Sequence, residues 1–238
     1  MIVTTPPKYF QFVLIVSFML ISTAAFSQGV NEDQTGAWYM GFVRKKFEKS
    51  RFGVQGDYQF RLWNTGSDLE QILLRTGATY KSNKSDVLWT VGYAHITSGE
   101  PGEGAATISE NRVYQEALIP HQAGSRFFLT HRYRFEQRWI EGLDYRTRFR
   151  YNIFLNIPIN RATLEKDAVY IALYNEIFIN DLLNFRTERN IRYFDRNRTY
   201  LGLGYCIKKN LRMQLGWMNQ TTIDWTKSQA QISAHCTF

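Results

Sequence analysis

Polar and apolar residues alternate through almost the whole chain, and this period of two limits the fold more than any other feature. In the stretch DYRTRFRYN, residues 144–152, arginine occupies every second position, at Arg146, Arg148 and Arg150. Tyrosine, threonine and phenylalanine occupy the alternate positions, 145, 147, 149 and 151. A period of two predicts a β-strand, here with one aromatic face and one cationic face. We therefore expect strands whose two faces meet different environments.

The same pattern recurs from about Trp38 to the last residue, Phe238, in eleven alternating segments. The polar faces are crowded with arginine, glutamine and tyrosine, and the apolar faces end in aromatic residues. A soluble β-sandwich has aliphatic inner faces and only moderately polar outer faces. A transmembrane antiparallel up-and-down β-barrel, with lipid outside and a polar lumen inside, fits the pattern better. Because such barrels usually have an even number of strands, we expect about 12, with 10 as the alternative.

The N-terminal residues 1–27 predict a secretory signal peptide. Lys8 supplies a positive charge, residues 10–26 are apolar, and Ala25-Phe26-Ser27 forms a small-x-small cleavage site. A transmembrane anchor is the alternative, but the apolar run is short for a membrane span. Cleavage would leave one domain, residues 28–238, with 28 basic and 21 acidic side chains. We expect this exported domain to lie in the bacterial outer membrane.

Five stretches of the chain together suggest a known family. They are QTGAWYMGF, GDYQFRLWNTGSDLEQILLRTGATY, RVYQEALIPHQAGSRFFLTHRYRFEQRW, DYRTRFRYNIFLNIP and YFDRNRTYLGLGY. With them the chain, from about residue 34 to residue 238, resembles the family catalogued as domain of unknown function 2490. The resemblance implies an outer-membrane β-barrel, typical of Bacteroidetes. It implies no activity, so only fold and location follow from it.

The most distinctive candidate site is a charged cluster on the polar faces. One hypothesis is a structural ladder of ion pairs that fills a narrow lumen, and the other is a narrow channel that attracts small anionic solutes. The size of the barrel favours the filled lumen. We expect outer-membrane lipid as a partner, no nucleic acid, and a monomer. The residues predicted to form this lumen charge network are Arg132, Arg134, Glu136, Arg138, Arg146, Arg148, Arg150, Glu176, Arg196 and Arg198.

Ser233 and His235 are the weak catalytic candidates. They share one face of the last strand, and esterase-type sites use a serine beside a histidine. A lipid-modifying enzyme of the deacylase type is therefore the alternative function, although no full triad is visible and a non-enzymatic barrel is favoured. Histidine and cysteine spacings match no metal site, and we expect no metal and no cofactor.

Strand pairing and topology can also be predicted. The short connection at residues 141–144 sets Glu136 opposite Arg148, and the next hairpin is expected to set Glu176 opposite Arg150. His131 has the parity of the lipid face, which a local bulge would explain. If the C-terminus is periplasmic, four connections lie on its side, and two longer ones, residues 98–109 and 181–192, lie outside. The four are residues 82–86, 121–125, 160–167 and 208–210.

Overall fold

The computed structural model describes residues 30–102, 106–181 and 192–238, which are built from β-strands. The predicted signal peptide, residues 1–27, lies outside the described residues. No helix in the described ranges is long and apolar enough to cross a membrane. The strands are β1 (Gly36–Lys46), β2 (Phe52–Asn64), β3 (Ser67–Lys81), β4 (Leu88–Gly99), β5 (Thr107–Ala123), β6 (Phe127–Ile140), β7 (Arg146–Pro158), β8 (Val169–Asn180), β9 (Phe194–Lys208), β10 (Leu211–Thr221) and β11 (Thr226–Thr237).

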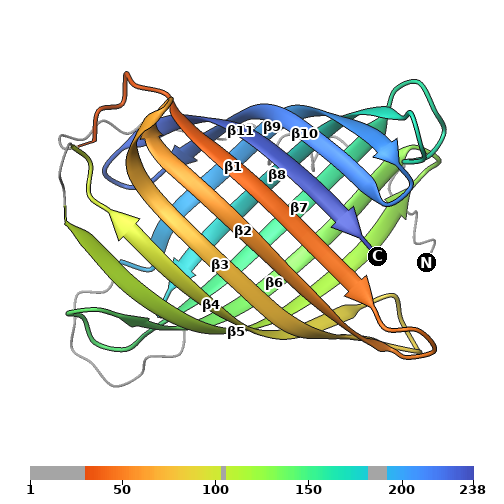
Figure 1. Cartoon of the computed structure of the whole chain (residues 1–238), viewed down its shortest axis with the longest axis horizontal. Helices are drawn as coiled ribbons and strands as arrows, with labels where there is room; N and C mark the ends of the chain where they lie inside the picture. The colour runs from red at the N-terminus through yellow and green to blue at the C-terminus, as the bar shows by residue number, and fades with distance from the viewer. Residues whose placement is uncertain (1–29, 103–105, 182–191) are drawn as a thin grey trace, which may run out of the picture.

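These strands form one closed barrel in which each strand pairs with its neighbours in sequence (Figure 1). Consecutive strands are antiparallel, but β1 and β11 close the barrel in parallel, from Gly36 opposite Gln229 to Arg44 opposite Thr237. The predicted 12 or 10 strands are therefore wrong, because the described residues form eleven. The expectation of an even number assumed antiparallel closure, whereas a parallel closing pair joins an odd number.

The two ends of the barrel carry different connections. The C-terminus lies at the same end as the connections 82–87, 124–126, 159–168 and 209–210, which agrees with the predicted grouping. We call this the C-terminal end. The connections after β4 and β8 lie at the opposite end, also as predicted, although residues 103–105 and 182–191 within them lie outside the described residues.

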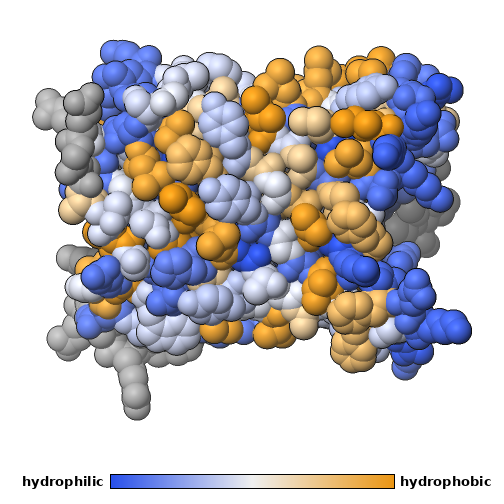
Figure 2. Space-filling view, in the orientation of Figure 1, coloured by the Kyte–Doolittle hydropathy of each residue, from blue (hydrophilic) through white to orange (hydrophobic). Residues whose placement is uncertain are grey.

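The alternation of the sequence separates an apolar outer face from a polar inner face. Large hydrophobic side chains within the strands are exposed on the outside, including Val91, Leu201, Leu203 and Leu215. Figure 2 shows hydrophobic side chains gathered over the middle of the wall and hydrophilic ones towards both ends. The inner face instead buries arginine, glutamate and glutamine. The barrel thus has its charged side chains inside and its apolar side chains outside.

His131 lies on the outer face without the predicted bulge. Its pairings with Ile119 and Ile153 belong to continuous registers on both sides of β6. Its Nδ1 is 2.8 Å from the hydroxyl oxygen of Tyr151, and its ring stacks on His121. The bulge prediction is therefore wrong, because a neighbouring outer tyrosine provides the hydrogen bond that this polar ring needs.

Candidate functional site

Two hairpins bring the predicted charged residues together inside the barrel. Between β6 and β7, Glu136 lies opposite Arg148, and Arg134 opposite Arg150, as predicted. Between β7 and β8 the prediction is wrong by two residues, because Glu176 lies opposite Asn152.

The longer connection 159–168 explains that shift. The side chain of Asn160 accepts a hydrogen bond from the Val169 amide at 2.8 Å and donates one to the Asp167 carbonyl at 2.9 Å. These contacts set the register of the β7–β8 hairpin, which the alternation of the strands does not predict.

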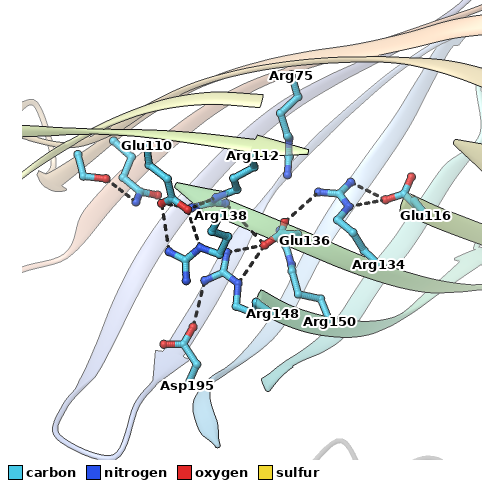
Figure 3. Close-up of polar contacts among 12 residues, drawn as sticks. Arg75, Glu110, Arg112, Glu116, Arg134, Glu136, Arg138, Arg148, Arg150 and Asp195 are labelled. Carbon is cyan, nitrogen blue, oxygen red and sulfur yellow. Dashed lines mark hydrogen bonds and ion pairs between the residues drawn. The ribbon is translucent and has the colours of Figure 1, made fainter. Parts of the chain in front are cut away.

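Glu136 is the carboxylate with the most ion pairs in this region, and it is almost fully buried. Oε2 accepts hydrogen bonds from Arg148 Nη2 at 2.7 Å and Nε at 3.0 Å, and Oε1 accepts one from Arg150 Nη1 at 2.7 Å (Figure 3). Arg134 and Arg112 add longer ion pairs at 3.8 and 3.9 Å. One carboxylate therefore joins arginines from three strands, which charge-assisted hydrogen bonds favour.

Further acids extend this arrangement in both directions. Glu110 accepts hydrogen bonds from Arg112 and Arg138, and Asp195 pairs with Arg148 (Figure 3). Asp195 also pairs with Arg196. The resulting contiguous set of eight arginines and five acids is called the ion-pair network. It contains Glu110, Arg112, Glu116, Arg132, Arg134, Glu136, Arg138, Arg148, Arg150, Glu176, Asp195, Arg196 and Arg198.

Nine of the ten residues in the predicted charge network lie in this set. The exception is Arg146, which forms no ion pair with the described residues. Sequence reasoning missed Glu110, Arg112 and Glu116, although they share the even-numbered face of β5. That strand was hard to recognise because its outer face is itself partly polar. Asp195 has the opposite parity to Arg196 and Arg198, and it lies beside a bulge in the β8–β9 pairing, so alternation could not have identified it.

Aromatic rings compensate part of the excess positive charge. The Arg198 guanidinium carbon lies 4.7 Å from the ring centroids of both Trp38 and Phe178. Arg61 lies 3.7 Å from the Trp38 ring and also bonds to glutamine side chains. Cation–π contacts of this kind stabilise a desolvated guanidinium by about 2 kcal/mol. Arginines can therefore outnumber acids in this interior.

Two separate cavities lie at opposite ends of the described barrel, and residues of the ion-pair network line the larger one. A cavity of about 530 Å³, which we call the cup, is lined by Lys46 and Lys81 at the C-terminal end and by Arg150 and Arg198 further in. A second cavity, of about 340 Å³, lies at the opposite end near Trp63, and the two share no lining residue. Side chains between them, including Arg148, Arg112 and Phe178, are at most 5% exposed. The cup is thus a pocket that opens at one end of the barrel and has a charged floor.

Comparison with known proteins now gives the family. The profile described as "Protein of unknown function (DUF2490)" matches residues 35–231. The chain belongs to this family. It is also 28% identical over 215 residues to an uncharacterised protein of Methylorubrum extorquens, and the match covers 87% of each chain.

The part of the chain that matches DUF2490 includes the whole ion-pair network, from Glu110 to Arg198. It ends at Gln231, before the two weak catalytic candidates. The network therefore lies within the family domain as its profile defines it, whereas the serine and histidine near the C-terminus lie beyond that match.

Ser233 and His235 line the cup and are in contact. The Ser233 hydroxyl oxygen lies 3.0 Å from His235 Nε2, and the imidazole stacks on Phe42 at 4.7 Å between ring centroids. No described carboxylate hydrogen-bonds to this histidine. Asp57 also lines the cup, but its carboxylate is held by Arg75. The geometry gives a nucleophile–base pair without an acid to orient it.

Proposed function

We propose that the protein is a β-barrel of the bacterial outer membrane whose lumen is closed by the ion-pair network, so that it has a structural role and does not conduct ions. Residues 1–27 would direct its export, and the C-terminal end would face the periplasm. The partner of its outer wall would be membrane lipid.

The outer wall supports a location in lipid. Exposed Leu, Val, Trp and Tyr side chains cover the middle of the strands. Outer polar side chains bond to one another: Asn175 donates to Asn197 at 2.9 Å, and Ser228 donates to Asn219 at 2.9 Å. In a bilayer, polar groups need such internal partners because the hydrocarbon offers none. In water, a barrel would instead be expected to expose its arginines and to bury its leucines.

The observation that carries the closed-barrel proposal is the burial of the ion-pair network across the lumen. Removing one partner of a buried ion pair costs about 3–5 kcal/mol, so the network will not open through thermal motion of a single side chain. We expect the purified protein to remain electrically silent in planar lipid bilayers. A porin in the same bilayers is the positive control, and heat-modifiable gel mobility shows that the barrel is folded. Stepwise, anion-selective currents would instead support a narrow anion channel.

A second candidate is a lipid-modifying enzyme, favoured by the hydrogen bond between Ser233 and His235. Cells that express Ser233→Ala or His235→Ala would then change their outer-membrane lipid composition, measured by mass spectrometry. Ser228→Ala, on the outer face of the same strand, is the matched control. Unchanged lipids in both cup variants would remove the enzyme hypothesis.

A further inference from the structure

The cup has a large excess of positive charge. Its lining includes twelve basic and four acidic residues. Each of those acids already pairs with a basic residue: Asp57 with Arg75, Asp86 with Lys81, Glu116 with Arg134 and Glu176 with Arg150. The lining acids therefore leave several cations of the cup uncompensated, and clefts lined by one sign of charge concentrate ions of the opposite sign.

Arg44 and Arg212 are uncompensated arginines that line the cup between its floor and its mouth. Neither has an ion pair with any residue that the structure describes. The register places Arg212 directly opposite His235, and His235 directly opposite Phe42, which is two residues before Arg44. The charges of both arginines act on His235 and on each other, and the Glu116 carboxylate, which is paired with Arg134, also acts on Arg44. The register thus places two arginines near one stacked imidazole and phenyl ring.

Aromatic side chains form another wall of the cup, on β7, β8 and β9. Tyr174 and Tyr200 stack at 4.8 Å between ring centroids, and Phe154 meets Tyr174 edge-on at 5.8 Å. The ring of Tyr200 lies so close to Gly202 and Gly216 that no side chain could be added at either position without a clash. The absence of side chains on the glycines lets the tyrosine lie flat against the wall, so the same cavity contains a preformed apolar surface and the two free arginines.

We propose that the cup binds a small organic anion, with its phosphate or carboxylate group between Arg44 and Arg212 and its apolar part against Phe42 and the tyrosine wall. Arginine suits this role because its planar fork donates two parallel hydrogen bonds to such groups. The volume, about 530 Å³, is in the usual range for small-molecule sites. The ligand enters from the C-terminal end, where Lys45, Lys46 and Arg51 line the mouth.

Phenyl phosphate is a suitable probe because it combines the anionic group and the apolar part of the expected ligand. In isothermal titration calorimetry with the folded barrel in nonionic detergent, we expect saturable binding, with weaker binding of inorganic phosphate and of phenol. Arg44→Gln and Arg212→Gln should each weaken the binding of phenyl phosphate about tenfold or more, because each removes a charge-assisted hydrogen bond. Lys209→Gln is the matched control, since it removes one positive charge from the same end of the barrel without altering the lining of the cup. The affinity of this variant for phenyl phosphate should stay unchanged.

Dihexanoyl phosphatidic acid, added as a competitor, distinguishes the source of the anion. Tighter binding than phenyl phosphate indicates a lipid headgroup, and weaker binding indicates a soluble solute. Heat-modifiable mobility confirms the fold of each variant, and Arg44→Gln is expected to fold normally because its exposed side chain has no described ion pair. Absence of saturable heat with both phosphates, or equal weakening in Arg212→Gln and Lys209→Gln, overturns the proposal. The measurement needs no bilayer, so its failure would leave the closed-barrel proposal intact.

Discussion

Arg150 donates two hydrogen bonds to a single carboxylate oxygen of Glu176, from Nε at 2.9 Å and from Nη2 at 2.6 Å. Arg132 donates to the same oxygen at 2.8 Å, and Arg198 lies 3.9 Å from the other oxygen. One acid on β8 thus neutralises arginines from three different strands. The long arginine side chain reaches this acid diagonally, although the two residues are not opposite one another.

This arrangement predicts a large loss of stability in Glu176→Ala. Three arginines would lose a buried counter-ion, and removing one partner of a buried pair costs about 3–5 kcal/mol. Glu48→Ala is the control, because Glu48 is exposed in a connection and has no ion pair with a described residue. Urea unfolding in lipid vesicles, followed by gel mobility, measures the difference. Equal stability of the two variants would refute a structural role for Glu176.

Glu136 and Arg148 should be strongly coupled. Each single substitution, Glu136→Gln or Arg148→Met, leaves a buried charge with fewer partners and is expected to destabilise the barrel. The double variant removes both charges and should lose less than the two single losses together, by about 0.5–3 kcal/mol. The free energies of unfolding of the four proteins give this coupling. Simple additivity would mean that the two side chains act independently.

The alternation of the sequence predicts which face of most strands is inside, because a charged side chain on the outer wall would be far from any partner. It also predicts the β6–β7 register, where the connection is short enough to fix the pairing. Alternation does not predict the strand partner of Glu176, since hydrogen bonds of the Asn160 side chain set where the longer β7–β8 connection closes.

The strand number and part of the network could not be predicted for other physical reasons. Closure depends on the pairing of β1 with β11, the two strands furthest apart in the chain, and alternation carries no information about its direction. Asp195 enters the network only through a bulge that reverses its parity. Trp38 lies on the inner face and contacts arginines. It could not be recognised as their partner from the sequence, because an uncharged residue does not contribute to the charge pattern.

Parallel closure predicts a specific cross-link. Gly41 lies directly opposite Ala234, and a Cβ added at Gly41 meets no neighbouring atom. In a background with both native cysteines replaced by serine, Gly41→Cys/Ala234→Cys should form a disulfide on mild oxidation, seen as a gel shift reversed by dithiothreitol. Gly41→Cys/Ala230→Cys is the control, because Ala230 lies four residues further along β11, beyond disulfide reach. Preferential cross-linking of the control would contradict the register.

The proposed orientation predicts which connections antibodies can reach on intact cells. An epitope tag inserted between β4 and β5, at residues 100–106, should be labelled without permeabilisation, because the proposed orientation places this end of the barrel on the outside of the cell. The same tag at residues 209–210, at the C-terminal end, should be labelled only after permeabilisation. The reverse pattern would show that the barrel is inserted the other way round.

The outer wall gives the most direct test of a membrane location. Leu215 is 62% exposed in the middle of β10, and Ile159 is 50% exposed in a connection at the C-terminal end. Leu215→Arg should lower the free energy of unfolding in vesicles by about 2–4 kcal/mol, because arginine is costly near the bilayer midplane, whereas Ile159→Arg should cost about 0–1 kcal/mol. Both substitutions add one charge to an exposed position, so a barrel in water would tolerate them equally. Equal stability of the two variants would therefore place the outer wall in an aqueous environment.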